Sequence, residues 1–158
     1  MNLVMEAVVT EDKHETRIAG MLRNAGADPV TILLEFMYHN SFAILKDERG
    51  KELKWSRHDG AVRGFRVMHN PPKVQVLQPG EAGEVATFTL STDSRRAAGC
   101  GDLHWTLTRL ASKTLSVEMG YEVIPEWGAS AKRLKADVAV GRWTSPPVVL
   151  PLTSPPRR

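Results

Sequence analysis

The sequence predicts an all-β protein, an antiparallel β-sandwich or barrel of about nine to eleven short strands with little helix. Three observations lead to this fold class. Apolar and polar residues alternate along many short stretches, which is the pattern of strands with one buried and one exposed face. Clusters of Gly, Pro, Asn and Asp separate those stretches. The best candidate for a helix, residues 129–135, is long enough for only about two turns.

The length of 158 residues fits one domain, which we expect over residues 1–153. Residues 154–158, Ser-Pro-Pro-Arg-Arg, are too polar and too rich in proline to pack, so they are expected to form a flexible tail. A parallel sheet is not expected, because parallel strands need long crossover connections and the sequence offers no helices to supply them.

The N-terminal third contains three candidate strands. Residues 3–9 and 18–22 alternate between apolar and polar positions, and residues 30–37 are apolar and rich in β-branched side chains. The stretch 24–29, Asn-Ala-Gly-Ala-Asp-Pro, separates the last two and is expected to form a loop.

The middle of the chain contains a candidate hairpin and several short strands. Residues 41–46 lead into a turn over 47–50, from which residues 51–55 return. Short edge strands are expected at 65–67 and 74–76, on either side of a proline-rich stretch. Pro79 and Gly80 then form a turn before a strand that points Ala86, Phe88 and Leu90 to one face and Val85, Thr87 and Thr89 to the other.

The C-terminal third contains the clearest alternation. Over 113–124 the residues expected to be buried are Leu115, Val117, Met119, Tyr121 and Val123. Residues 103–108 alternate in the same way, and Ala111–Lys113 is interpreted as a hairpin connection between the two strands. Further strands are expected over 134–140 and 148–152.

Composition and charge favour an ordinary globular protein. The net charge is +3, the basic residues are scattered rather than clustered, and nucleic-acid binding is therefore not expected. No apolar run is long enough to span a membrane. The single cysteine excludes an internal disulfide, and the first ten residues lack the features of a signal peptide, so we expect a cytoplasmic protein.

Several segments resemble bacterial immunoglobulin-like domains. These segments are Leu22–Asn24 followed by Pro29-Val30, Phe42–Asp47 with Gly50 and Trp55, Leu77–Glu81, Gly101–Arg109, and Trp143–Pro146 before Val148. Within that group the order over residues 22–81 is most similar to the bacterial intracellular proteinase inhibitor family, with Phe88 where a tryptophan would be expected. The resemblance implies an immunoglobulin-like β-sandwich and a protease as partner.

The sequence shows no recognisable catalytic or metal-binding motif. The five histidines, His14, His39, His58, His69 and His104, lack the spacing of metal ligands, so neither a metal nor a cofactor is expected. Cys100 lies between two glycines and is interpreted as an unreactive loop cysteine, because no base to form a thiolate can be placed beside it. We therefore do not expect an enzyme.

The stretch 55–66 is the first candidate for a binding surface, because it is basic and contains aromatic residues that are enriched in protein interfaces. Its candidate contact residues are Trp55, Arg57, His58, Arg63, Phe65 and Arg66. Trp127, in Pro-Glu-Trp-Gly, is a rival exposed anchor on another loop. The alternatives are a solvated loop for 55–66 and packing over the end of the fold for Trp127.

These observations favour a non-catalytic module that binds a protein, with inhibition or regulation of a protease as the specific hypothesis. A second hypothesis is a structural or assembly subunit that pairs through an exposed sheet edge. A third is an enzyme with an unrecognised site on the loops. The oligomeric state stays open: an inhibitor would be monomeric alone, whereas an assembly subunit would self-associate.

Overall fold

The computed structural model describes residues 1–34, 40–57, 73–92 and 96–152. These residues form twelve strands, paired antiparallel throughout, and the short helix α2. The predicted mostly β, antiparallel fold with little helix is therefore confirmed. The predicted strand over 65–67 and the expected tail over 154–158 lie outside the described residues.

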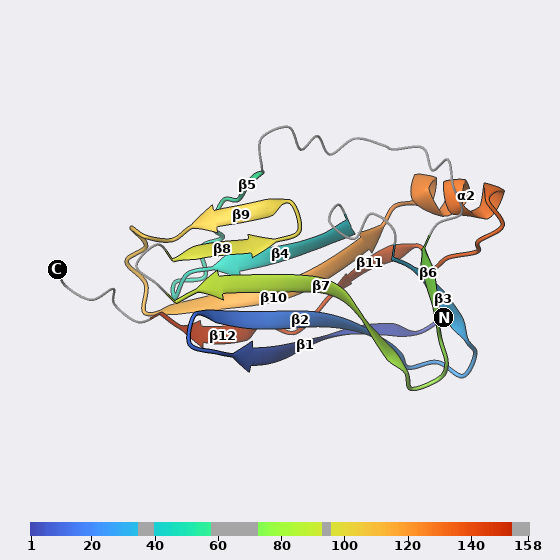
Figure 1. The fold of residues 1–158 in the computed structure, drawn as a ribbon, viewed down its shortest axis with the longest axis horizontal. Coiled ribbons are helices and arrows are strands. Elements are labelled where there is room, and N and C mark those ends of the chain that lie inside the picture. The colour runs from blue at the N-terminus through green and yellow to red at the C-terminus, as the bar shows by residue number, and fades with distance from the viewer. Residues whose placement is uncertain (35–39, 58–72, 93–95, 153–158) are drawn as a thin grey trace.

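The larger sheet contains six strands (Figure 1). Their spatial order is β1 (Leu3–Glu11), β2 (Glu15–Asn24), β7 (Ala82–Ser91), β8 (Ala97–Cys100), β9 (Leu103–Thr106) and β5 (Ser56–Arg57). The strands β1 and β2 form a long hairpin, and β5 is a two-residue strand at the opposite edge. The sheet therefore ends on one side in a long strand and on the other in a very short one.

The second sheet is built around the long strand β10 (Thr114–Val123). On one side β10 pairs with β4 (Ser41–Lys46). On the other side it pairs with two short strands in succession, β12 (Val148–Pro151) along its first half and β11 (Gly141–Thr144) along its second. Ser145 bridges the gap between them, because its N–H donates to the Met119 carbonyl and its Oγ accepts from the Met119 N–H.

A small third sheet and the helix lie at one end of the molecule (Figure 1). The third sheet pairs β3 (Val30–Leu33) with β6 (Val74–Leu77). The hydroxyl of Tyr121 on β10 donates to the carbonyl of Leu33, which ties this sheet to the core. The helix α2 spans Pro125–Arg133 and follows β10 directly.

The two main sheets pack closely because small residues face the gap between them. Ala7, Gly20 and Ala86 are cross-strand neighbours on β1, β2 and β7. A Cβ at Gly20 would lie 2.6 Å from the Met5 Cε and 3.4 Å from the Cβ of Met119 on the second sheet. Glycine therefore lets the centre of β10 approach the larger sheet.

The core confirms the alternation predicted for the best strand. Leu115, Val117, Met119, Tyr121 and Val123 are all buried, at 0 or 1% exposure. The predicted inward residues of β9 are buried as well, and the Trp105 ring meets Phe88 edge to face with 6.3 Å between ring centroids. Side chains from both main sheets thus contribute to one apolar core.

The predicted hairpin between residues 103–108 and 113–124 is wrong. β9 pairs with β8 and β5 in the larger sheet, whereas β10 lies in the second sheet. The connection 107–113 therefore crosses from one sheet to the other. Alternation predicts a strand with a buried face, but it is the same for a neighbour in one sheet and for a strand in the facing sheet.

Contrary to the prediction, Val85 does not share a face with Thr87 and Thr89, because β7 contains a bulge. Gly20 pairs with Ala86 and the next residue, Met21, pairs with Glu84, so Val85 has no partner on β2. An extra residue of this kind interrupts the alternation of faces. Val85, Ala86, Phe88 and Leu90 are consequently all buried.

The strand predicted over 134–140 is also absent, since this segment connects α2 with β11 without strand pairing. It is nevertheless attached to the third sheet, because the N–H of Ala139 donates to the carbonyl of Thr31 at 2.9 Å. Val138 and Ala139 are adjacent in sequence and both buried, which an alternating strand with one exposed face would not allow.

Candidate binding surface

The chain that leads into the candidate binding stretch 55–66 is attached to the core just before Trp55. After the turn at Asp47–Gly50, the chain returns along β4, and the Leu53 N–H donates to the carbonyl of Leu45 at 2.8 Å. Leu53 packs against the core, and its carbonyl accepts a long hydrogen bond of 3.4 Å from the Trp105 indole. The predicted turn and return are therefore confirmed in part: the return pairs with β4 at Glu52 and Leu53 but forms no strand over 51–55.

Trp55 is one of the exposed large apolar side chains, with 43% of its surface accessible. The guanidinium carbon of Arg57 lies 4.7 Å from the centroid of its ring. A guanidinium over an indole face is attracted by the ring quadrupole, and at an exposed site such a contact contributes about 0.5–1 kcal/mol. The pair therefore presents a flat, positively charged surface whose conformation is partly fixed before any partner arrives.

The strand β5 holds this pair at the edge of the larger sheet. Ser56 pairs with His104 and Arg57 pairs with Leu103 on β9. Since β5 is only two residues long, the edge of β9 is covered over a short distance within the described residues. A hollow of about 440 Å³ adjoins the segment, and its described lining is Glu52, Leu53, Lys54 and Trp55.

Sequence reasoning missed the lining of this hollow. Residues 52–54 were interpreted only as the return strand of a hairpin, yet they combine a carboxylate, an apolar side chain and an ammonium beside Trp55. The available signal was the sequence Glu-Leu-Lys-Trp itself, in which the apolar positions alternate with charged ones. The remaining candidates of the 55–66 stretch, His58, Arg63, Phe65 and Arg66, lie outside the described residues.

Trp127 packs over the end of the fold, as the alternative interpretation expected, and is not an exposed anchor. It is 7% exposed and lies in the first turn of α2, not on a loop. Pro125 stands at the start of this helix, where its missing N–H costs nothing, and Lys132 and Arg133 stand in the last turn, where cations are favourable. The apolar side chains of the helix recur at helical spacing and pack toward the core; they are Trp127, Ala131 and Leu134. Trp127 therefore covers the end of the fold and is not available as a recognition anchor.

Cys100 is not a loop residue, as the sequence suggested, but the buried last residue of β8, at 1% exposure. Burial raises the pKa of its thiol to about 12, against an opposing hydrogen bond with Ser41. The thiol is therefore protonated at neutral pH and is a poor nucleophile.

Within the described ranges, no group of three or more His, Cys, Asp or Glu side chains is arranged to hold a metal ion. His39, His58 and His69 fall in the gaps between those ranges. His104 lies on the outer face of the larger sheet, opposite Ser56 and Gly99, and is half-buried.

Comparison with known proteins finds no matching family model and no matching curated protein. Among the helices of the described residues, none has the length and apolar character needed to cross a membrane.

Proposed function

We propose that this protein is a non-catalytic module that binds a protein partner through the edge of its larger sheet at Trp55 and Arg57. The observation that carries the proposal is the exposed indole with the Arg57 guanidinium stacked on it, beside a hollow with an apolar floor. Tryptophan and arginine dominate the energetically important positions of protein interfaces, where they fill pockets on the partner or receive its side chains.

The strand order supports an immunoglobulin-like form of the sandwich. In that fold strands A, B and E are neighbours in one sheet, and C, F and G are neighbours in the other. Here β1, β2 and β7 are neighbours in the larger sheet, and β4, β10 and the pair β11 and β12 are neighbours in the second. The larger sheet differs by its extension through β8, β9 and β5.

The segment after β2 supports the resemblance to bacterial immunoglobulin-like domains in which a strand ends on an asparagine, the group that includes the intracellular proteinase inhibitors. Asn24 is fully buried, and its side-chain amide donates to the carbonyls of Asp28 and Leu77 at 2.8 and 3.0 Å. Its Oδ1 accepts from the N–H of Gly26. One side chain thus closes the loop after β2 and joins it to the end of β6. On this basis we propose that the partner is a protease and that the module acts inside the cell.

The test is inhibition of proteases by the purified chain. A panel of bacterial intracellular proteases is assayed by cleavage of fluorogenic peptides while the chain is titrated. We expect saturable inhibition of at least one protease, and Trp55→Ala should raise the inhibition constant at least tenfold, equivalent to about 1.4 kcal/mol. Arg57→Ala should weaken inhibition in the same direction, because it removes the cation and frees the indole.

The matched control is Val149→Ala, which removes an apolar side chain that is 64% exposed on β12 of the other sheet. It should leave both inhibition and the melting temperature unchanged. If Val149→Ala and Trp55→Ala weaken inhibition equally, the contact is not at the β5 edge. If no protease is inhibited, the protease hypothesis fails. Photo-crosslinking from position 55 in native extract then tests the wider proposal, which fails if no protein is captured above the position-149 control.

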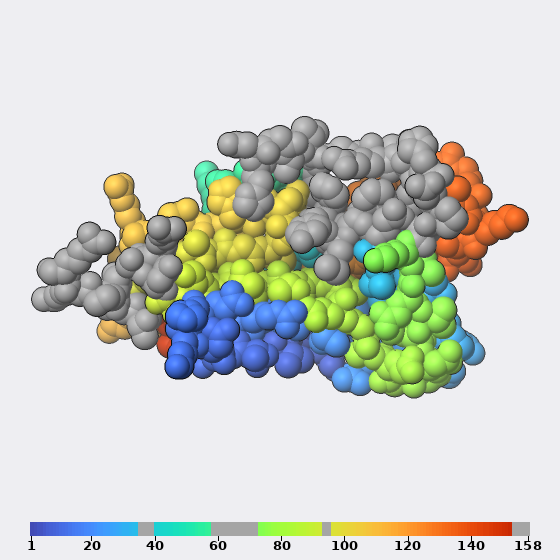
Figure 2. Space-filling model, viewed as in Figure 1, coloured from blue at the N-terminus to red at the C-terminus, as the bar shows by residue number. Residues whose placement is uncertain are grey.

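A specific observation favours assembly as a second candidate function. On the edge strand β1, Val4, Val8 and Val9 are 42, 51 and 40% exposed. Figure 2 shows β1 and β2 in blue along one border of the molecule. Long apolar edge strands are templates for pairing with another chain. Sedimentation velocity at increasing concentration should then show self-association that Val8→Lys abolishes, and a monomer at all concentrations would exclude this function.

A further inference from the structure

A second hollow, of about 430 Å³, is lined by residues from the turn after β4 and from the connection between β9 and β10. These segments lie at the end of the sandwich opposite α2 (Figure 1). The hollow is formed by the turn after β4, the residue before β8, the connection from β9 to β10 and the residue after β12. Its lining includes three cationic side chains, Arg96, Arg109 and Lys113, and one carboxylate, that of Glu48.

Hydrogen bonds join the turn after β4, the connection from β9 to β10 and the residue after β12 into a frame. The N–H of Glu48 donates to the Ser112 Oγ at 3.0 Å, and the N–H of Lys113 donates to the Glu48 Oε2 at 3.1 Å. The carbonyl of Lys113 accepts from the N–H of Leu152 at 2.8 Å. The walls of the hollow are therefore held in place without a ligand, which lowers the entropic cost of binding one.

Among the described residues that line the hollow, the charge is predominantly positive. One oxygen of the carboxylate that they include, on Glu48, is already used by a backbone N–H. Within the part of the chain that the structure describes, Arg109 and Lys113 form no ion pair. Arg96 is 8% exposed, and its backbone carbonyl accepts from the N–H of Leu107 at 3.2 Å. Arg109 and Lys113 are therefore the two cations on which the binding of an anion in this hollow rests.

We propose that this hollow binds a small organic phosphate. Arginine matches the oxygens of a phosphate with its forked donors, and lysine adds a mobile point charge. The hollow is larger than a phosphate ion and lies within the range of small-molecule sites. Leu110, Ala111 and Leu152 supply apolar lining beside the cations, where the carbon skeleton of such a ligand packs.

Ribose 5-phosphate, inorganic phosphate and ribose are the three probes, titrated into the isotopically labelled chain and followed by nuclear magnetic resonance and calorimetry. We expect saturable binding of ribose 5-phosphate, weaker binding of inorganic phosphate and none of ribose, with shifts confined to the amides of residues 47–50 and 107–113. Binding of inorganic phosphate as tight as that of the ester would overturn the organic part of the proposal.

The variant Arg109→Ala with Lys113→Ala should weaken binding of ribose 5-phosphate at least tenfold, and both side chains are exposed, so the fold should persist. The matched control, Lys132→Ala with Arg133→Ala, removes the same two charges from α2 at the other end and should leave the affinity unchanged. Equal weakening by both double variants would show diffuse attraction by net charge and overturn the site. So would the absence of saturable binding. Trp55→Ala should not alter this affinity, which separates the site from the protein-binding surface.

Discussion

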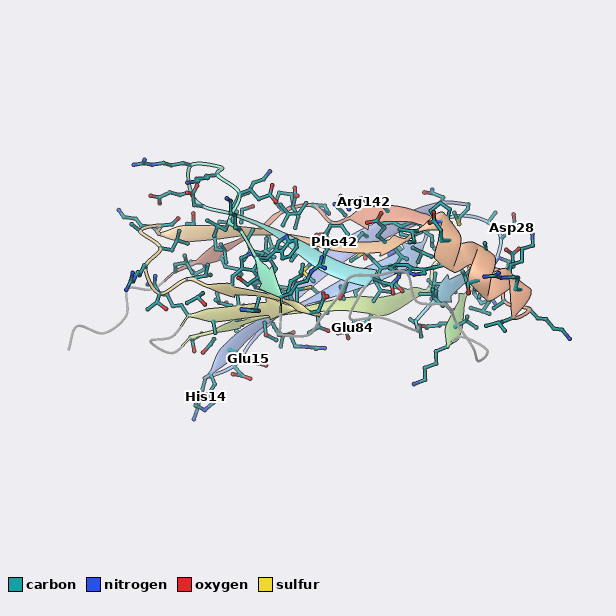
Figure 3. All side chains as sticks on the ribbon, turned by 90° about the horizontal axis from the view of Figure 1, so that it is seen from above. His14, Glu15, Asp28, Phe42, Glu84 and Arg142 are labelled. Carbon is teal, nitrogen blue, oxygen red and sulfur yellow. The ribbon has the colours of Figure 1, made fainter. Side chains whose placement is uncertain are left out.

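Gly120 shows how the absence of a side chain fixes an aromatic ring. It lies opposite Phe42 on the outer face of the second sheet, and a Cβ at Gly120 would come within 2.2 Å of two ring atoms of Phe42. The Arg142 guanidinium covers the ring from above, 4.1 Å from its centroid, and pairs with Glu122 at 2.9 Å (Figure 3). The ring is therefore confined between a backbone and a cation.

Gly120→Ala should lower the free energy of unfolding by about 1–3 kcal/mol, because the added methyl group overpacks the contact with Phe42. Urea denaturation measures this change. The control is Gly99→Ala, since the nearest atom to a Cβ at Gly99 is 3.7 Å away, and this change should be neutral or slightly stabilising. Equal costs for the two variants would show that Phe42 moves aside freely.

Two buried weak acids, Cys100 and Tyr121, should lower the stability of the folded state at alkaline pH. Burial raises the pKa of the Cys100 thiol from 9.0 to about 12 and also raises the pKa of the Tyr121 hydroxyl. Both groups are neutral when protonated, and the folded state holds their protons more tightly than the unfolded chain does. Their contribution to stability is complete below the unfolded pKa and is lost as the pH rises toward the folded pKa.

We therefore expect the free energy of unfolding to fall as the pH rises from 9 toward 12, with a smaller decrease in Cys100→Ala than in the parent chain. Urea titrations at a series of pH values measure the slope. The variant also removes packing, so the comparison is between the slopes and not between the absolute stabilities. Parallel slopes would mean that the thiol is not held protonated by the fold.

The exposure of two tryptophans shows what the sequence could and could not predict about single side chains. Trp55 is exposed, and its position where the return from a predicted turn ends is a signal that the sequence carries. Trp127 was placed on a loop because Pro and Gly flank it. Proline is equally suited to the first turn of a helix, and the apolar spacing from Trp127 to Leu134 was the stronger signal.

At the scale of elements, strand β10 provides the sharpest test of register. Met119 is fully buried, whereas Glu118 beside it points to the outer face. Met119→Ala should cost about 2–5 kcal/mol through lost transfer energy and the cavity that remains. Glu118→Ala should change stability by less than about 0.5 kcal/mol, because Glu118 lies half-buried on the outer face and its loss leaves no cavity in the core. Chemical denaturation of both variants measures the difference, and similar costs would mean that the strand is shifted by one residue.

The strands could be predicted where period-two alternation was long, as in β1, β2, β7 and β10. Which strands pair could not be predicted, because alternation is a local property and pairing depends on contacts between distant residues. The connection 107–113 is the example, since its length suits a hairpin as well as a crossing between sheets. The segment 134–140 alternates in sequence, but α2 before it and the contact with Thr31 decide its path.

At the scale of the whole molecule, the core is continuous across both main sheets, so the protein should unfold as one unit. Trp105 reports on the larger sheet and Trp143 on the second. Tryptophan fluorescence and far-ultraviolet circular dichroism should therefore give coincident thermal transitions. Two separated transitions would show that one sheet persists without the other and would contradict a single cooperative domain.

The bulge in β7 has a consequence for how the chain can change in length. Gly83 and Glu84 on one side of Val85, and Ala86 and Thr87 on the other, already alternate between buried and half-exposed positions as if Val85 were not there. Loss of the Val85 codon would therefore remove one core side chain but leave every other residue of the strand on its present face. Loss of Ala86 would have the same effect, because Val85 would take its buried position, whereas a deletion elsewhere inside β7 would exchange the two faces for part of the strand. Descendants of this gene should thus tolerate a missing residue at Val85 or Ala86 more readily than at other interior positions of β7.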